Sequence, residues 1–293
     1  MLGYKHRAFL LDISERIPKE STFQDIIDIL ARYRYNELFL FSNSPAPEGT
    51  INLSRIDAYC QLQDVKLSTL NHETYEALTT NPATIRVQTE ASRSLSGRIE
   101  CMRERMIAAD TEAKRRKAER FLVEDLADGY NWHPLIVSLP GIIMGGNFAL
   151  NGVKSKNMDL EREINAVLGA PLGGYLLELG TLYLRGGAFR SDASEFFNIL
   201  AGDVGYSRHP GITQMILDEV SGIAQGIIIA AQRWQSRCDW ANEIIYAAKL
   251  LDAACHRRDE TRLRDIRVEH GTIWKTRFLD FGKVESMAKL PRF

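Results

Sequence analysis

The feature that most constrains the fold is a regular alternation, across the first 125 residues, of short apolar runs with helix-like segments. Five of these runs have the length and composition of buried strands. They are Phe9–Ser14, Leu38–Phe41, Val65–Leu70, Ala83–Thr89 and Phe121–Val123. Helical patterns lie between them, for example at Ser54–Gln63 and Ile99–Arg120. Strands that alternate with helices predict a parallel sheet with right-handed crossovers.

From Asp159 onward the patterns become mostly helical. The predicted helices are Leu160–Leu168, Gly174–Leu184, Ser191–Leu200, Gly211–Arg237 and Trp240–Arg258. We therefore expect an α/β fold: a partial (β/α) TIM-type barrel of about five parallel strands in residues 1–150, followed by an all-helical region in residues 151–293. Five strands cannot close a standard eight-stranded barrel, so the sheet edges must stay open or be covered.

Composition narrows the function. With 45% hydrophobic residues the chain can bury a sizeable core, and its net charge of -1 argues against a general nucleic-acid binder. The basic run Lys114-Arg115-Arg116-Lys117 is flanked by Glu112 and Glu119, which is typical of a solvated helix face; a phosphate or nucleic-acid contact is the alternative. No apolar run approaches the ~20 residues that span a bilayer, which predicts no membrane association.

The cysteines and the N-terminus bear on compartment. Cys60, Cys101, Cys238 and Cys255 are far apart and have no zinc-binding spacing, which predicts reduced thiols, no metal and no other cofactor. The N-terminus leads directly into a strand-like run, which predicts no signal peptide. Together these features favour a cytoplasmic protein.

Polar residues follow the predicted strands, where function gathers in parallel α/β folds. Carboxylates and a histidine at these ends suit acid/base chemistry or a metal, although no HExxH spacing is present. The candidate catalytic residues are Asp12, His72, Glu73, Glu90, Glu124 and Asp125. The alternative is that Asp12 and Asp125 are structural and pair with Arg7, Arg16 or Arg98.

Several segments are similar to one known family. The run Arg7-Ala-Phe-Leu-Leu-Asp12-Ile-Ser14, a helix, and then Tyr35-Asn36-Glu37-Leu38-Phe39-Leu40 resemble the opening of the catalytic barrel of family 20 glycoside hydrolases, the β-N-acetylhexosaminidase-like enzymes. Later segments follow in the family's order and extend the resemblance over most of the chain. They are Cys60–Leu78 (third strand), Ser92–Arg98 (after the seventh strand), Glu124–Gly141 (eighth strand and loop), and Trp274, Arg277 and Ser286 in the tail.

The departures from the family suggest a shortened and degenerate barrel. Between Leu78 and Ala83 the family has three further strands, one of which ends in the Asp-Glu pair that orients the acetamido group and protonates the leaving oxygen. Glycoside hydrolysis needs such a proton donor. Leu126 and Ser92 stand where the family has sugar-facing tryptophans, and Asn131 replaces a histidine. The resemblance and the position of His133 beside Trp132 give the ligand-binding candidates Arg98, Asp128, Asn131, Trp132 and His133.

Three hypotheses follow. The first is a non-catalytic binding or assembly subunit, in a homo-oligomer or in a complex with another chain that completes the barrel, with a carbohydrate or small-molecule ligand. The second is a repurposed, biosynthetic enzyme that uses the carboxylates and His72 at the strand ends. The third is residual hydrolysis of N-acetylhexosaminides, with Glu90 or Glu124 in place of the lost acid.

Overall fold

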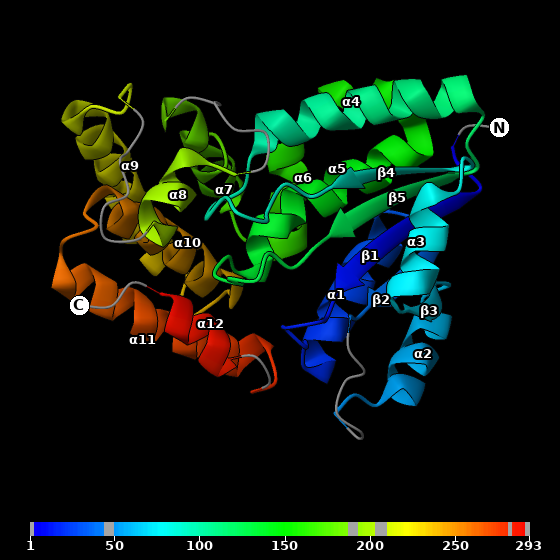
Figure 1. Cartoon of the computed structure of the whole chain (residues 1–293), viewed down its shortest axis with the longest axis horizontal. Coiled ribbons are helices and arrows are strands. Elements are labelled where there is room, and N and C mark those ends of the chain that lie inside the picture. Colours follow the sequence, from blue (N-terminus) through cyan, green and yellow to red (C-terminus); the bar gives the residue numbers. More distant parts are fainter. Residues whose placement is uncertain (1–2, 44–49, 187–192, 203–209, 281–282, 291–293) are drawn as a thin grey trace.

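The computed structural model describes residues 3–43, 50–186, 193–202, 210–280 and 283–290. Five parallel strands form one sheet in the order β3-β2-β1-β5-β4 (Figure 1). The strands are β1 (His6–Asp12), β2 (Glu37–Phe41), β3 (Lys66–Leu70), β4 (Thr84–Gln88) and β5 (Arg120–Asp125). Each overlaps one of the five predicted runs, so the predicted α/β fold with a helical C-terminal region is confirmed.

Four helices cover one face of this sheet. They are α1 (Glu20–Arg32), α2 (Leu53–Leu62), α4 (Ile99–Arg116) and α5 (Leu139–Asn151). Their buried side chains join Phe9, Leu38 and Phe121 in one hydrophobic cluster. The steps β4 to β5, β1 to β2 and β2 to β3 all run in the same direction across the sheet. A sheet wound in one direction, with its crossover helices on one side, has the arrangement of a barrel segment.

The other face is covered by α3 (His72–Thr80), which was not predicted. This helix connects β3 and β4, the two edges of the sheet. Tyr75 and Leu78 of α3 pack against a small cluster made of Ala8, Leu10, Phe39, Phe41 and Leu122. In a closed barrel this face would line the interior. A single helix therefore lies where further strands would otherwise enclose the barrel.

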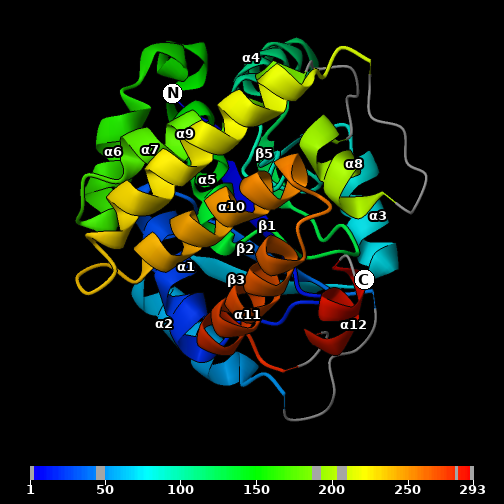
Figure 2. The same ribbon diagram turned by 90° about the vertical axis from the view of Figure 1, so that its left-hand side faces the viewer.

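Most of the helical region lies beyond the carboxyl ends of the strands (Figures 1 and 2), whereas its first two segments, residues 152–157 and 160–168, pack against α5. Its α-helices are α6 (Leu160–Leu168), α7 (Gly173–Leu179), α8 (Glu195–Ala201), α9 (Gln214–Gln232), α10 (Trp240–Cys255), α11 (Glu260–Arg277) and α12 (Lys283–Lys289). Short 3-10 helices are η1 (Leu135–Ser138), η2 (Gly152–Asn157) and η3 (Leu182–Gly186). Of the predicted helix 191–200, the first two residues lie outside the described ranges. The division at residue 150 stays a prediction, because buried residues on both sides of it belong to one cluster.

By length and composition alone, two segments among the described residues are long and apolar enough to span a membrane. The first, Leu135–Asn157, is 78% buried, as is typical of a core helix in a soluble protein. The second, Gln214–Gln232, is only 33% buried. All four cysteines are free thiols, as predicted.

Candidate functional site

The carboxylate of Asp12, at the end of β1, is held by main-chain amides. One oxygen accepts a hydrogen bond from the Ser14 amide at 2.9 Å, and the other accepts one from the Ala127 amide at 3.1 Å. Asp12 thus ties the end of β1 to the loop after β5. The hydrogen bonds to Asp12 come from main-chain amides and not from Arg7, Arg16 or Arg98, the arginines considered as its partners.

Asp125, at the end of β5, is buried and joins three segments. Its Oδ1 accepts hydrogen bonds from the hydroxyls of Thr89 and Ser138, each at 2.7 Å. Its Oδ2 is buried and has no hydrogen-bond partner among the described residues. Hydroxyl donors from the end of β4 and from η1 therefore stabilise this acid, rather than the predicted arginine.

The candidates after β5 belong to a second buried network. Arg16 donates a 2.6 Å hydrogen bond to the main-chain oxygen of His133, and burial together with Arg16 lowers the pKa of His133. Asp128 accepts hydrogen bonds from the amides of Arg93, Tyr130 and Asn131. Burial works to raise the pKa of Asp128, but His133 and these amides outweigh it and lower that pKa. The network orders the loop and leaves these groups little contact with solvent.

Asn131 and Trp132 also serve the packing of this loop. The Asn131 amide nitrogen donates to Glu15 at 2.6 Å. Trp132 is 1% exposed and donates from its indole nitrogen to the main-chain oxygen of Ser286 at 3.3 Å. Ser286 in turn donates to the main-chain oxygen of Tyr130 at 2.6 Å. The C-terminal helix therefore fastens this loop, so Trp132 offers no open platform for a sugar ring.

Glu90 is buried between two cations from the following segment. Its side chain forms ion pairs with Arg98 and, at 2.5 Å, with Arg105 of α4. The thiol of Cys101 lies 3.7 Å from the same carboxylate. Glu90 has a left-handed φ of 60°, which is uncommon outside glycine. Burial and the two ion pairs hold the Glu90 side chain in place, so the contacts of this residue are structural.

His72 and Glu73 lie apart from these networks, in the exposed first turn of α3. Within the described ranges neither side chain forms a hydrogen bond or an ion pair. The turn itself is fixed by the capping box between Asn71 and Thr74. In the part of the chain that the structure describes, the predicted acid/base candidates Asp12, Asp125, Glu90 and the His72–Glu73 pair therefore have separate sets of contacts.

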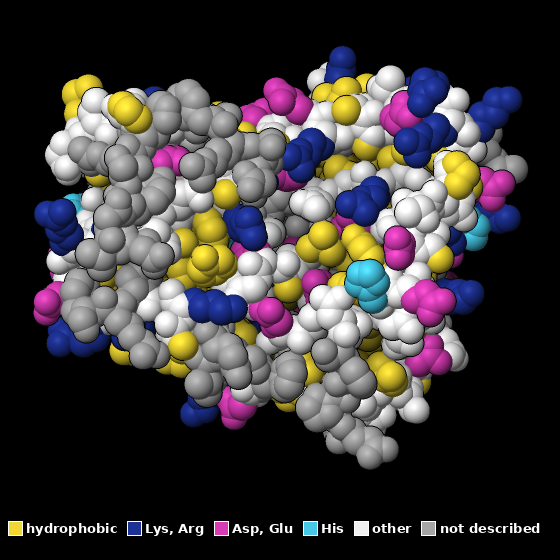
Figure 3. Space-filling model, in the orientation of Figure 1, with side chains coloured by type: hydrophobic (Ala, Val, Ile, Leu, Met, Phe, Trp, Pro, Cys, Tyr) yellow, Lys and Arg dark blue, Asp and Glu magenta, His cyan; other side chains and the backbone are white. Residues whose placement is uncertain are grey.

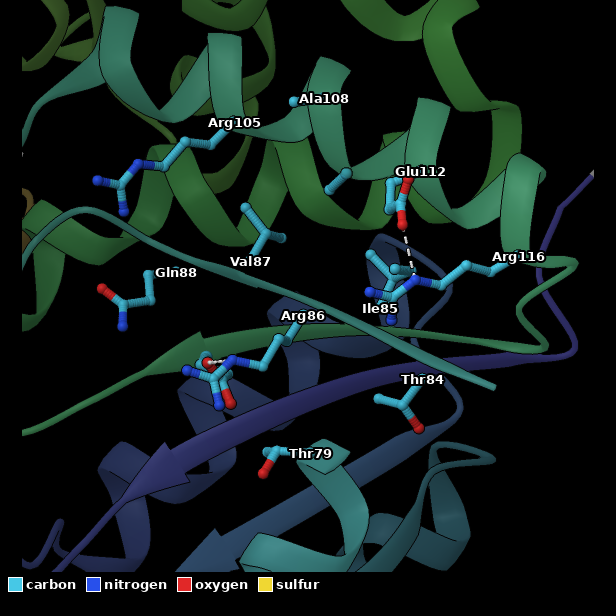
Figure 4. Close-up of a pocket in the computed structure, with 12 residues that line it drawn as sticks. Thr79, Thr84, Ile85, Arg86, Val87, Gln88, Arg105, Ala108, Glu112 and Arg116 are labelled. Atoms are coloured by element: carbon cyan, nitrogen blue, oxygen red, sulfur yellow. Dashed lines mark hydrogen bonds and ion pairs between the residues drawn. The ribbon is translucent and has the colours of Figure 1, made fainter. Parts of the chain in front are cut away.

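An open groove lies beside β4, between α3 and α4, with a volume of about 560 Å³ (Figure 4). Its lining residues are Thr79, Thr84, Ile85, Arg86, Val87, Gln88, Arg105, Ala108, Ala109, Glu112, Arg116 and Glu124. The space-filling view shows basic side chains over α4 and β4 on this face of the molecule (Figure 3). Of the sequence-predicted candidates, only Glu124 lines this groove.

Glu124 meets two residues that the sequence analysis did not single out. Its Oε1 accepts a hydrogen bond from the Tyr75 hydroxyl at 3.2 Å, and its Oε2 lies 3.5 Å from Nε of Arg86. Burial raises the pKa of Glu124, and Arg86 and Tyr75 only partly oppose it. Burial and Glu124 raise the pKa of Tyr75 to about 12. The sequence does hold a signal for the position of Tyr75. The capping box at the start of α3 predicts a helix after β3, and Tyr75 lies in that helix.

The floor of the groove is the open edge of β4. The Thr89 amide donates to the Glu124 oxygen, and the Arg120 amide donates to the Ala83 oxygen, each at 3.0 Å. Alternate residues of a parallel strand bond to the same neighbour, so the odd-numbered residues of β4 face β5. The main-chain N–H and C=O groups of Arg86 and Gln88 therefore point into the groove. Among the described residues none pairs with them.

No protein-family model matches the sequence, and no curated protein is similar to it. The assignment of function therefore depends on the groove and on the buried networks described above.

Proposed function

We propose that this protein is a non-catalytic binding or assembly module, in which an extended segment of another chain pairs with the open edge of β4. The observation that carries the proposal is the groove itself: an unpaired parallel edge strand opens into it, with the main-chain groups of Arg86 and Gln88 directed outward. Peptides commonly bind such edges by adding a strand. Unprotected edges of this kind otherwise favour aggregation.

The strand order supports this location. A singly wound sheet ordered β3-β2-β1-β5-β4 is what an eight-stranded barrel keeps when its fourth, fifth and sixth strands are removed. In the family 20 resemblance, β4 takes the place of the seventh strand, whose neighbour would be the missing sixth. The groove therefore occupies the place where a barrel would have its next strand. A shortened, degenerate barrel would be completed there by a partner chain.

The charge of the groove favours an acidic partner. The side chains of Arg86, Arg105 and Arg116 are 46%, 38% and 42% exposed, whereas that of Glu124 is fully buried. The accessible charge is therefore mainly cationic, although each arginine already has an acidic neighbour. Guanidinium groups have several donors and can bind a second carboxylate. We expect glutamate or aspartate at alternate positions of the added strand, since alternate side chains share one face.

The test compares the two open edges. Arg86→Pro removes an outward N–H of β4 without removing a hydrogen bond to β5. Thr69→Pro is the matched control on β3, where the Lys66 and Leu70 bonds show that even-numbered residues face β2. Each variant is expressed in the native source and recovered with whatever partner it binds. We expect Arg86→Pro to lose the partner chain and Thr69→Pro to keep it. The amides of Arg86 and Gln88 should also exchange slowly with solvent in the parent complex. Fast exchange of both amides in that complex would reject the proposal.

A second candidate function is an enzyme centred on Glu124, which the raised pKa and the adjacent Tyr75 and Arg86 favour. Both enzyme hypotheses of the sequence analysis, the repurposed enzyme and residual hydrolysis, fall under this second candidate function. A chromogenic N-acetylhexosaminide tests hydrolysis. Turnover that disappears in Glu124→Gln but persists in Glu90→Gln would support it, and an inactive parent would reject it. A cytoplasmic location is proposed for either function, because all four cysteines are free.

A further inference from the structure

Helix α9 forms the outermost layer of the helical region and crosses the surface in front of α10 (Figure 2). Its inward side, which includes Leu217, Val220, Ala224 and Ile227, is buried. One line of residues faces outward, because spacings of three and four keep residues on the same side of a helix. This line, called the α9 stripe below, consists of Met215, Glu219, Gly222, Gly226, Ile229 and Arg233.

The α9 stripe is apolar at positions where the fold gives no reason for it. Met215 and Ile229 are 76% and 60% exposed. A Cβ atom added to Gly222 or Gly226 would meet nothing within 4 Å, so the packing of the chain on itself does not require glycine there. Each glycine costs a helix about 1 kcal/mol relative to alanine. Exposed apolar side chains on either side of two open glycines form a shallow surface onto which another helix can fit closely.

We propose that the α9 stripe binds the α9 stripe of a second copy of this protein, with the two helices antiparallel and the two-fold axis between Gly222 and Gly226. The positions of the stripe are symmetric about this point. The axis places Gly222 opposite Gly226 of the second copy, Glu219 opposite Ile229, and Met215 opposite Arg233. A self-complementary patch of this kind is what a two-fold dimer requires.

The charges on α9 select the antiparallel arrangement. Asp218 and Glu219 lie in its first half, whereas Arg233 and Arg237 follow its last turn. An antiparallel copy places the acidic end of one helix beside the basic end of the other. A parallel copy would place like charges together, which is unfavourable. Glu219 already pairs with Arg185 of η3 at 3.3 Å, so η3 borders the interface.

The size of the stripe predicts a weak dimer. At 1.5 Å per residue the helix is about 28 Å long. One helix pair of this length gives an interface near the lower end of the specific range, which is roughly 1,200 Å² in total. We therefore expect dimerisation in the micromolar range, visible as a solution mass that rises with protein concentration.

Sedimentation equilibrium of the full chain over a range of concentrations tests the proposal. Ile229→Lys should reduce the association constant at least tenfold. Val268→Lys is the matched control, since Val268 is 66% exposed on α11, and it should leave the association unchanged. Arg233→Asp should weaken the dimer, and adding Asp218→Arg to it should restore at least part of the loss.

Two results would overturn the proposal. One is a parent protein that stays monomeric at every concentration. This includes a monomer that binds lipid vesicles through α9 and floats with them in a density gradient. The other is an equal loss of association in Ile229→Lys and Val268→Lys. This test is independent of the proposed strand addition at β4, because Arg86→Pro should leave the self-association through α9 intact.

Discussion

Gly145 and Gly146 determine how closely α5 approaches the sheet and α1. A Cβ atom on Gly145 would clash with a methyl group of Val123, and one on Gly146 would lie 2.6 Å from the main-chain oxygen of Tyr33. Because backbone cannot move aside cheaply, we expect Gly146→Ala to lower the free energy of unfolding by about 1–3 kcal/mol. Urea denaturation measures this change. Gly271→Ala on α11 is the control: nothing lies within 4 Å of its Cβ, so it should stabilise the helix by roughly 0.5–1 kcal/mol.

The buried carboxyl of Glu124 makes stability depend on pH. Its pKa in the folded protein is raised above 4.5 by burial. The folded state then holds a proton that the unfolded chain has released, so this contribution to stability declines as pH rises from about 4.5 through the raised pKa. We expect Glu124→Gln to be more stable than the parent at pH 8, and the difference to shrink toward pH 4. A variant that is less stable at every pH would show that the contact with Arg86 dominates instead.

At the residue scale, the sequence predicted where the acidic residues lie in the sheet better than it predicted which groups bind them. Strand ends can be identified from apolar runs, so Asp12, Glu90 and Asp125 were correctly expected near the carboxyl ends of the strands. Their partners come from elsewhere: backbone amides for Asp12, hydroxyls for Asp125, and arginines of a later segment for Glu90. Such contacts depend on how helices pack, which single-residue patterns do not encode.

At the scale of elements, apolar periodicity decided what could be predicted. The five strands were found because each has a compact apolar run. Helix α3 was missed because none of its residues is buried, although its capping box marks its start. Helix α11 lies in the region that was expected to be helical, but its bounds were not predicted, because it is rich in charge and has a weak apolar side. The helix from Ile99 ends earlier than expected, at Arg116, because Lys117 adopts a left-handed φ of 55° and ends the helix.

Arg277 connects three elements and gives a prediction at this scale. Its guanidinium pairs with Glu243 of α10 at 2.6 Å and with Asp25 of α1 at 2.7 Å, and it lies 4.0 Å from the centre of the Trp240 ring. Arg277→Met leaves Glu243 buried without its cation, which should cost about 3–5 kcal/mol near neutral pH.

The pH dependence of this variant has a definite sign. Burial already raises the pKa of Glu243, and removing the cation raises it further. A protonated Glu243 is cheaper to bury, so the loss should shrink as pH falls. The double variant Arg277→Met/Glu243→Gln should recover part of the loss at pH 7. If the single and double variants unfold alike at every pH, the ion pair is not what stabilises this junction.

At the scale of the whole molecule, the sheet with its covering helices and the helical region share one hydrophobic core. One hydrophobic cluster contains strand residues such as Phe9 together with Tyr246 and Ala247 of α10. Polar contacts also cross the proposed division: Glu243 accepts a 2.9 Å hydrogen bond from the Ile136 amide of η1. A sheet of five strands does not close into a barrel, so it lacks the stabilisation that closure gives. Helices packed at its carboxyl end stabilise it instead.

We therefore expect that residues 1–150 do not fold alone. Expressed separately, this fragment would expose the side of η1 that α10 covers and the side of α5 that α6 covers, and it would leave Asp25 without Arg277. It should show helical signal without a cooperative thermal transition, and it should bind a hydrophobic dye. Co-expression with residues 151–293 should restore a soluble complex with a sharp transition, because the two pieces share one core. A fragment that melts cooperatively without its counterpart would instead establish two independent domains, and the sheet would then be stable with its carboxyl end uncovered.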